Sequence, residues 1–63
     1  MVKRIEIKTP SSVVAERVEN FLAGLAVMDA VSVTQADYTF HVEAYSTKAV
    51  MAINERFGSY IRG

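Results

Sequence analysis

No cysteine occurs in the chain, which excludes disulfide bonds and thiolate metal sites. The single histidine, His41, cannot form an imidazole cluster by itself. These absences matter because the core of so short a chain supplies only about 3–5 kcal/mol, and small domains usually add a disulfide, a metal or a partner. We therefore expect no metal and no cofactor, and we expect stability to come from close packing or association.

An excess of charge of one sign is also missing. Seven Lys and Arg residues balance seven Asp and Glu residues, so the formal net charge is zero. Nucleic-acid binding needs a positive field that displaces counterions from phosphates, and this balance therefore argues against a nucleic-acid partner. A neutral surface also gives little protection against association, which favours an oligomer.

Long hydrophobic runs are absent as well. No apolar stretch reaches the roughly 18 residues of a membrane span, and Lys3, Arg4 and Glu6 place charges where a signal peptide is apolar. These observations predict a cytoplasmic protein with no membrane partner. The 63 residues are too few for two domains and no linker or repeat divides them, so residues 1–63 are predicted to form a single domain.

The first two elements follow from a change in periodicity. Residues 2–8 alternate, with Ile5 and Ile7 on one face, and predict a strand that ends at Thr9 and Pro10. The same two residues are expected to begin a helix, with the Thr9 hydroxyl as its cap and Pro10 in its first turn.

Residues 11–26 have the spacing of an amphipathic helix. Its buried stripe is predicted to contain Val14, Val18, Phe21, Leu22 and Leu25. Gly24 lies inside this helix, where glycine costs about 1 kcal/mol. We interpret it as a site of close packing against a strand rather than as the start of fraying.

Two more alternating segments, 30–34 and 38–44, predict strands that a hairpin connects at residues 35–37. Their inward positions are Val31, Val33, Tyr38, Phe40, Val42 and Ala44. Ser46 is expected to cap a second helix, which Gly58 ends, leaving residues 59–63 as a less ordered tail. The stripe of that helix is predicted to contain Val50, Ile53, Phe57 and Ile61, and the remaining core positions are assigned to Met28, Met51 and Phe21.

Each predicted strand has one apolar face and each helix has one apolar stripe. The economical arrangement is an α+β fold of order β-α-β-β-α, a two-layer sandwich in which both helices cover one face of a three-stranded sheet. The other face is expected to be solvated, and it carries Arg4, Glu6, Lys8, Ser32, Thr34, Thr39, His41 and Glu43. Such a sheet has two open edges, and a second copy or a partner could supply a further strand.

His41 is the natural candidate for acid–base or phosphoryl chemistry, with Thr39 and Glu43 two residues away on the same strand face. A solvated surface histidine is the favoured interpretation, because the strand offers no loop cleft and no glycine-rich anion site. Glu16 and Glu19 share a helix face, which we interpret as a polar surface rather than a cation site. No nucleophile elbow, P-loop or dinucleotide motif occurs. The sequence therefore predicts no catalytic residues, no small-molecule substrate and no enzyme activity.

Residues 30–33 and 42–51 place two strands before a helix that begins with Ser46 and continues with small and apolar residues. This pattern resembles the middle of the histidine-containing phosphocarrier (HPr) family, and the strand and helix around Pro10 are similar to the start of that family. The family's phosphorylated histidine lies in a Gly-x-His-Ala-Arg-Pro segment, where residues 7–10 of this chain read Ile-Lys-Thr-Pro. The resemblance implies a truncated relative without the phosphorylatable histidine, in which Ser46 matches a regulatory serine and is a candidate for modification.

The leading hypothesis is a non-catalytic protein-interaction module that self-associates or docks on a larger protein. Its predicted interaction surface contains Arg4, Glu6, His41, Glu43, Tyr45, Tyr60 and Ile61. Two functional alternatives stay open, a phosphoryl-relay component that uses His41 and a small nucleic-acid-binding protein. Half of a ferredoxin-like domain, without its last strand, fits the same pattern, and its edge strands would then pair in a dimer.

Overall fold

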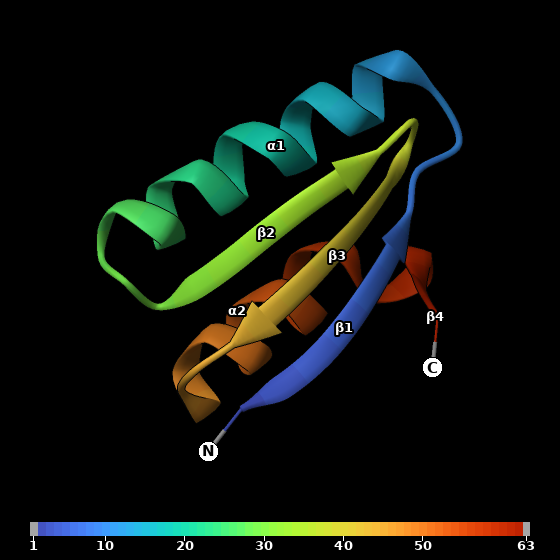
Figure 1. Ribbon diagram of the computed structural model, residues 1–63. Helices are drawn as coiled ribbons and strands as arrows, with labels where there is room; N and C mark the ends of the chain where they lie inside the picture. The colour runs from blue at the N-terminus through green and yellow to red at the C-terminus, as the bar shows by residue number, and fades with distance from the viewer. Residues whose placement is uncertain (1, 63) are drawn as a thin grey trace.

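The computed structural model describes residues 2–62 (Figure 1). In chain order its elements are β1 (Lys3–Lys8), α1 (Ser12–Val27), β2 (Val31–Ala36), β3 (Thr39–Ala44), α2 (Thr47–Phe57), the 3₁₀ helix η1 (Gly58–Tyr60) and β4 (Ile61–Arg62). The predicted α+β class and the order β-α-β-β-α are confirmed. The short strand β4 was not predicted.

The sheet has the strand order β2-β3-β1-β4, and every neighbouring pair is antiparallel. Strand β3 is central among the long strands, because it pairs along its whole length with both β1 and β2. Strands β1 and β2 therefore run in the same direction with β3 between them. This is the split β-α-β arrangement of ferredoxin-like domains.

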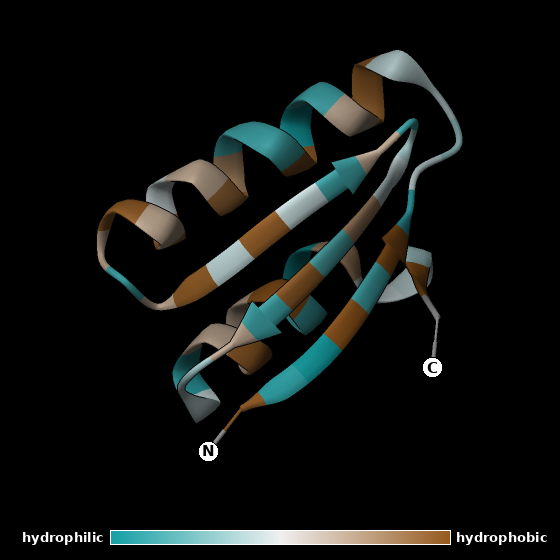
Figure 2. Cartoon of the chain, viewed as in Figure 1, coloured by the Kyte–Doolittle hydropathy of each residue, from teal (hydrophilic) through white to brown (hydrophobic). Residues whose placement is uncertain are grey.

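One face of the sheet forms the core. In the register of the sheet Ile5 lies opposite Val42 and Ile7 lies opposite Phe40, and all four side chains are buried. The buried residues of α1 and α2 belong to the same cluster, which places both helices on this face, as predicted. Hydrophobic and hydrophilic residues alternate along β1 and β3 in Figure 2 because successive side chains point to opposite faces.

The first helix begins two residues later than predicted. The cap is Ser11, whose Oγ accepts a hydrogen bond of 3.4 Å from the Val14 amide. Thr9 is buried instead, and both its amide and its hydroxyl donate to the carbonyl oxygen of Tyr38, at 2.9 and 2.6 Å. Thr9, the predicted cap residue, therefore connects the end of β1 to the hairpin between β2 and β3 through these two hydrogen bonds.

That hairpin is a two-residue turn at Asp37 and Tyr38. Asp37 has a φ of 56°, in the left-handed region, which aspartate tolerates better than most residues. The turn therefore forms without glycine, and the Gln35 side-chain amide donates to the Asp37 carbonyl at 2.9 Å. The prediction that Tyr38 faces the core is wrong, because Tyr38 belongs to this turn and is exposed.

Two aromatic rings join the helices at one end. Phe21 of α1 meets Phe57 of α2 edge to face, with ring centroids 5.5 Å apart. The Arg56 guanidinium lies 4.8 Å from the centre of the Phe21 ring. Phe57 and Phe40 are buried and Phe21 is half-buried, so the three phenylalanines take the predicted packing role.

Three other packing predictions are wrong. Met28 and Met51 are 69% and 63% exposed, because Met28 follows the last turn of α1 and Met51 lies outside the buried stripe of α2. Gly24 is exposed, and no atom beyond its chain neighbours and the adjacent helix backbone lies within 4 Å of where its Cβ would be. Close packing against a strand therefore does not explain this glycine.

The residues after α2 are ordered, contrary to the predicted loose tail. Gly58 ends α2 as expected, and η1 then leads the chain back to the sheet. Ile61 pairs with Ile7 of β1 rather than extending the helix stripe, and both Tyr60 and Ile61 pack against the core. Gly63, the last residue of the predicted tail, lies outside the described residues.

Replacing Gly24 with alanine should stabilise the protein. The position is an exposed helix interior with room for a methyl group, so Gly24→Ala should gain up to about 1 kcal/mol. That gain corresponds to a rise in Tm of roughly 4–8 °C for a domain of this size. Thermal unfolding followed by circular dichroism measures it, and Ala23→Gly is the matched control that should lower Tm. A lower Tm for Gly24→Ala would mean that the glycine is required at this position.

Candidate interaction surfaces

The outer face of the sheet brings together four of the predicted interaction residues. Arg4 lies opposite Glu43, and Glu6 lies opposite His41, in the pairing of β1 with β3. The Arg4 Nε and a Glu43 carboxylate oxygen are 3.5 Å apart, in side chains that are 87% and 45% exposed. An ion pair this open to solvent contributes little stability. This face is a polar surface of mixed charge.

His41 lies in the middle of that face. It sits between Glu6 on β1 and Thr34 on β2 in the register of the sheet, at a shallow depression that Arg4, Ser32 and Glu43 help to line. The imidazole is exposed, and no helix or loop covers it. A phosphoryl relay through His41 stays a prediction.

Of the three other predicted residues, Tyr45 lies at the end of β3, whereas Tyr60 and Ile61 lie away from the outer sheet face. Tyr45 directly follows β3 and is exposed, and its amide donates to the Ala30 carbonyl at 2.9 Å. Tyr60 and Ile61 instead lie in η1 and β4, half-buried against the core beside β1. The seven residues of the predicted surface are therefore divided between two places.

Ser46 begins α2, as expected. Its Oγ accepts a hydrogen bond of 3.2 Å from the Ala49 amide, and its backbone is extended, as a cap requires. This bond accounts for a serine at the position. Modification of Ser46 stays a prediction.

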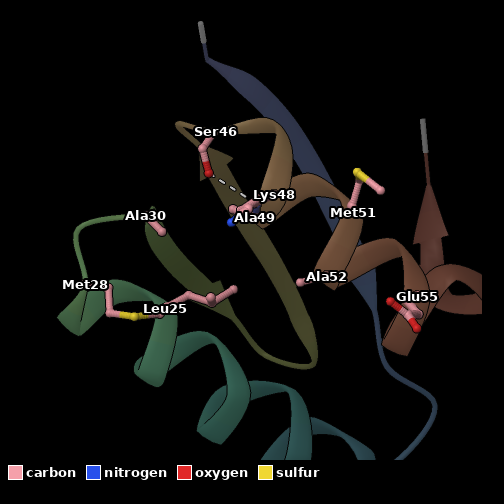
Figure 3. Close-up of a pocket in the computed structure, with 9 residues that line it drawn as sticks. All are labelled: Leu25, Met28, Ala30, Ser46, Lys48, Ala49, Met51, Ala52 and Glu55. Atoms are coloured by element: carbon pink, nitrogen blue, oxygen red, sulfur yellow. Dashed lines mark hydrogen bonds between the residues drawn. The ribbon is translucent and has the colours of Figure 1, made fainter.

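An apolar groove that the sequence did not predict lies elsewhere, on the helical layer. A groove of about 510 Å³ separates the C-terminal end of α1 from the N-terminal part of α2 (Figure 3). We call it the helical groove, and it is lined by Leu25, Met28, Ala30, Ser46, Lys48, Ala49, Met51, Ala52 and Glu55. Leu25 and Met28 lie on one side of it, and the α2 residues lie on the other.

The groove has a simple origin in side-chain size. At one end of the helix pair the rings of Phe21 and Phe57 meet edge to face between α1 and α2. At the other end the residues facing that space include Ala30, Ala49 and Ala52, whose methyl groups are too short to close it. The apolar floor is therefore left open to solvent.

A signal for this groove was present in the sequence. Met51 and Ala52 are apolar but lie outside the stripe of Val50, Ile53 and Phe57, which already suffices to bury α2. Exposed apolar residues outside the helix stripe that packs on the core indicate a second contact face. Because the methionines were assigned to the core, this face was not predicted from the sequence.

The open edge of β2 is another unpartnered feature. In the sheet of residues 2–62, β2 has a neighbour on one side only, and none of its six residues is charged. Beside β1 the opposite edge is partly covered by β4, and its uncovered part carries Lys3 and Arg4. Charges at an edge discourage pairing with another chain, so β2 is the less protected edge.

Two searches of residues 2–62 for other kinds of site found nothing. No group of three or more His, Asp or Glu side chains within the described part of the chain could hold a metal ion. Neither α1 nor α2 combines the length and apolar character that crossing a membrane requires.

Comparison with protein-family models, with curated proteins and with solved structures found no match to this chain. The resemblance to the phosphocarrier family stays a prediction.

Removing the Ser46 hydroxyl should destabilise the protein moderately. Ser46→Ala loses the bond to the Ala49 amide and should cost about 1 kcal/mol. Ser46→Asp keeps a capping oxygen and adds a negative charge at a helix N-terminus, so it should be as stable as the wild type. Urea unfolding of the three proteins measures both effects. Equal stability of the alanine variant would show that the cap contributes nothing.

Proposed function

We propose that this chain is a non-catalytic protein-interaction module that binds another protein chain through the helical groove. The observation that carries the proposal is the exposure of two methionines on either side of an apolar groove, Met28 at 69% and Met51 at 63%. A small domain that leaves such side chains in water gains stability when a partner covers them. The cytoplasmic location predicted from the sequence is part of this proposal.

The chemistry of the groove favours a helical or extended apolar segment as its occupant. Leu25, Ala30 and Ala52 supply an apolar floor, while the flexible thioethers of the methionines adapt to side chains of different shape. Lys48 and Glu55 stand at the polar rim, where charges select a partner rather than provide most of the affinity. An amphipathic helix in an apolar groove is a common mode of recognition of this kind.

The outer sheet face supports this function less well. Its central residues Arg4, Glu6, His41 and Glu43 are charged or titratable, with Arg4 and His41 exposed and the two glutamates half-buried. Charged residues are depleted at the centres of protein interfaces. A contact there would have to remove water from each charge. The apolar groove carries no such cost on its floor.

Charged substitutions in the groove should weaken binding without unfolding the domain. Both methionines are largely exposed, so the double variant Met28→Glu, Met51→Glu should fold normally. Val2→Glu, Val13→Glu is the matched control, since these two valines are also exposed and do not line the groove. Two measurements compare the wild type, the groove variant and the control. Sedimentation velocity from low to high micromolar concentration measures self-association, and capture from a native extract detects bound partners.

We expect the wild type and the control to self-associate or to retain a partner, and the groove variant to bind about tenfold more weakly or worse, which corresponds to a loss of at least 1.4 kcal/mol. A wild type that stays monomeric and retains no protein beyond those held by the groove variant would contradict the proposed function.

A further inference from the structure

Four residues of α2 form one strip along the rim of the helical groove. Lys48, Met51, Ala52 and Glu55 are spaced at i, i+3, i+4 and i+7, which places them on one face of the helix. Lys48, Met51 and Glu55 are exposed and Ala52 is half-buried. We call this set the α2 strip.

The α2 strip is complementary to itself. Lys48 lies three residues before Met51, and Glu55 lies three residues after Ala52, so the charges are placed symmetrically about the centre of the strip. A second α2 that runs antiparallel across this centre places each Lys48 opposite the Glu55 of the other copy. A parallel pair would instead place lysine opposite lysine and glutamate opposite glutamate.

The centre of the strip suits a close contact between two helices. Met51 and Ala52 of both copies would meet there, and the small alanine allows helix axes to approach to about 8–10 Å. The flexible methionine can fill the irregular space that remains. The same contact would bring the apolar floors of the two helical grooves next to each other, covering Leu25 and Met28 in part.

The two charges also have no partner within their own helix. No residue three or four positions from Lys48 or Glu55 is charged, so neither can form the pair that usually stabilises an isolated helix surface. Lys48 precedes Glu55 by seven residues, a rise of about 10.5 Å along the helix, which is too far for a direct bond between them. Within residues 2–62 neither charge takes part in an ion pair, so each can pair with the other copy.

We infer that the partner in the groove is a second copy of this chain, bound through an antiparallel two-fold contact between the α2 helices. This inference rests on the proposed function and names its partner. The contact is isologous, since the same residues face each other from both copies.

Charge reversal at the two ends of the strip tests the pairing. Lys48→Glu alone gives a strip with two glutamates, and Glu55→Lys alone gives a strip with two lysines, so each variant repels its own copy twice. Both substitutions follow the preference of a helix for acidic residues near its start and basic residues near its end, and both sites are exposed. The variants should therefore fold, which circular dichroism and Tm verify.

Sedimentation velocity measures dimerisation of each protein and of an equimolar mixture of the two single variants. We expect the wild type to dimerise with rising concentration and each single variant to associate about tenfold more weakly or worse. The mixture should form a heterodimer, because it restores a lysine opposite a glutamate at both ends. The double variant Lys48→Glu, Glu55→Lys should dimerise like the wild type.

The other outcomes separate this inference from the proposed function. A dimer that tolerates both single reversals would overturn the α2 contact and point to another surface, such as the edge of β2, while leaving self-association intact. A wild type that is monomeric but retains a foreign partner through Met28 and Met51 would show that the groove does not bind a second copy. The proposed interaction function would then still stand. A monomer without any groove-dependent partner would overturn both.

Discussion

Strand β3 pairs along its full length with β1 on one side and β2 on the other, and the other elements depend on this double pairing. The strand carries Phe40, Val42 and Ala44 on one face, all buried. Because the inward residues of all three long strands share that face, both helices must cover the same side of the sheet. The opposite face carries mainly charged and polar residues, among them Arg4, Glu6, His41 and Glu43, and it remains polar.

This one-sided arrangement also explains why the helical layer carries the groove in which we propose that a partner binds. Two helices on one small sheet touch each other only where their side chains are large enough, as Phe21 and Phe57 are. Where Ala49 and Ala52 face the space between α1 and α2, the floor of the helical groove remains open. A chain with one small core and no disulfide would gain stability if a second chain covered such a floor, as we propose.

Sequence periodicity identified the buried faces of the long strands, because alternation at residues such as Ile5 and Ile7 reports directly which face is buried. It failed where tertiary contacts decide. Thr9 looked like a helix cap, but a distant carbonyl in the β2–β3 turn takes its hydroxyl. Strand β4 has two residues, too few to show a period. Met28 and Met51 are hydrophobic by composition, and only the packed helices reveal that both side chains lie outside the core.

We infer that two copies of this chain meet through the helical groove and the α2 strip. The most direct measurement is the change in backbone amide chemical shifts of ¹⁵N-labelled protein between low micromolar and millimolar concentration. The account predicts that concentration-dependent shifts gather on α2 at Met51 and Ala52, extend to Met28 at the end of α1, and leave β2 unchanged. Shifts gathered at Ser32 and Thr34 of β2, or spectra that do not change with concentration, would contradict it.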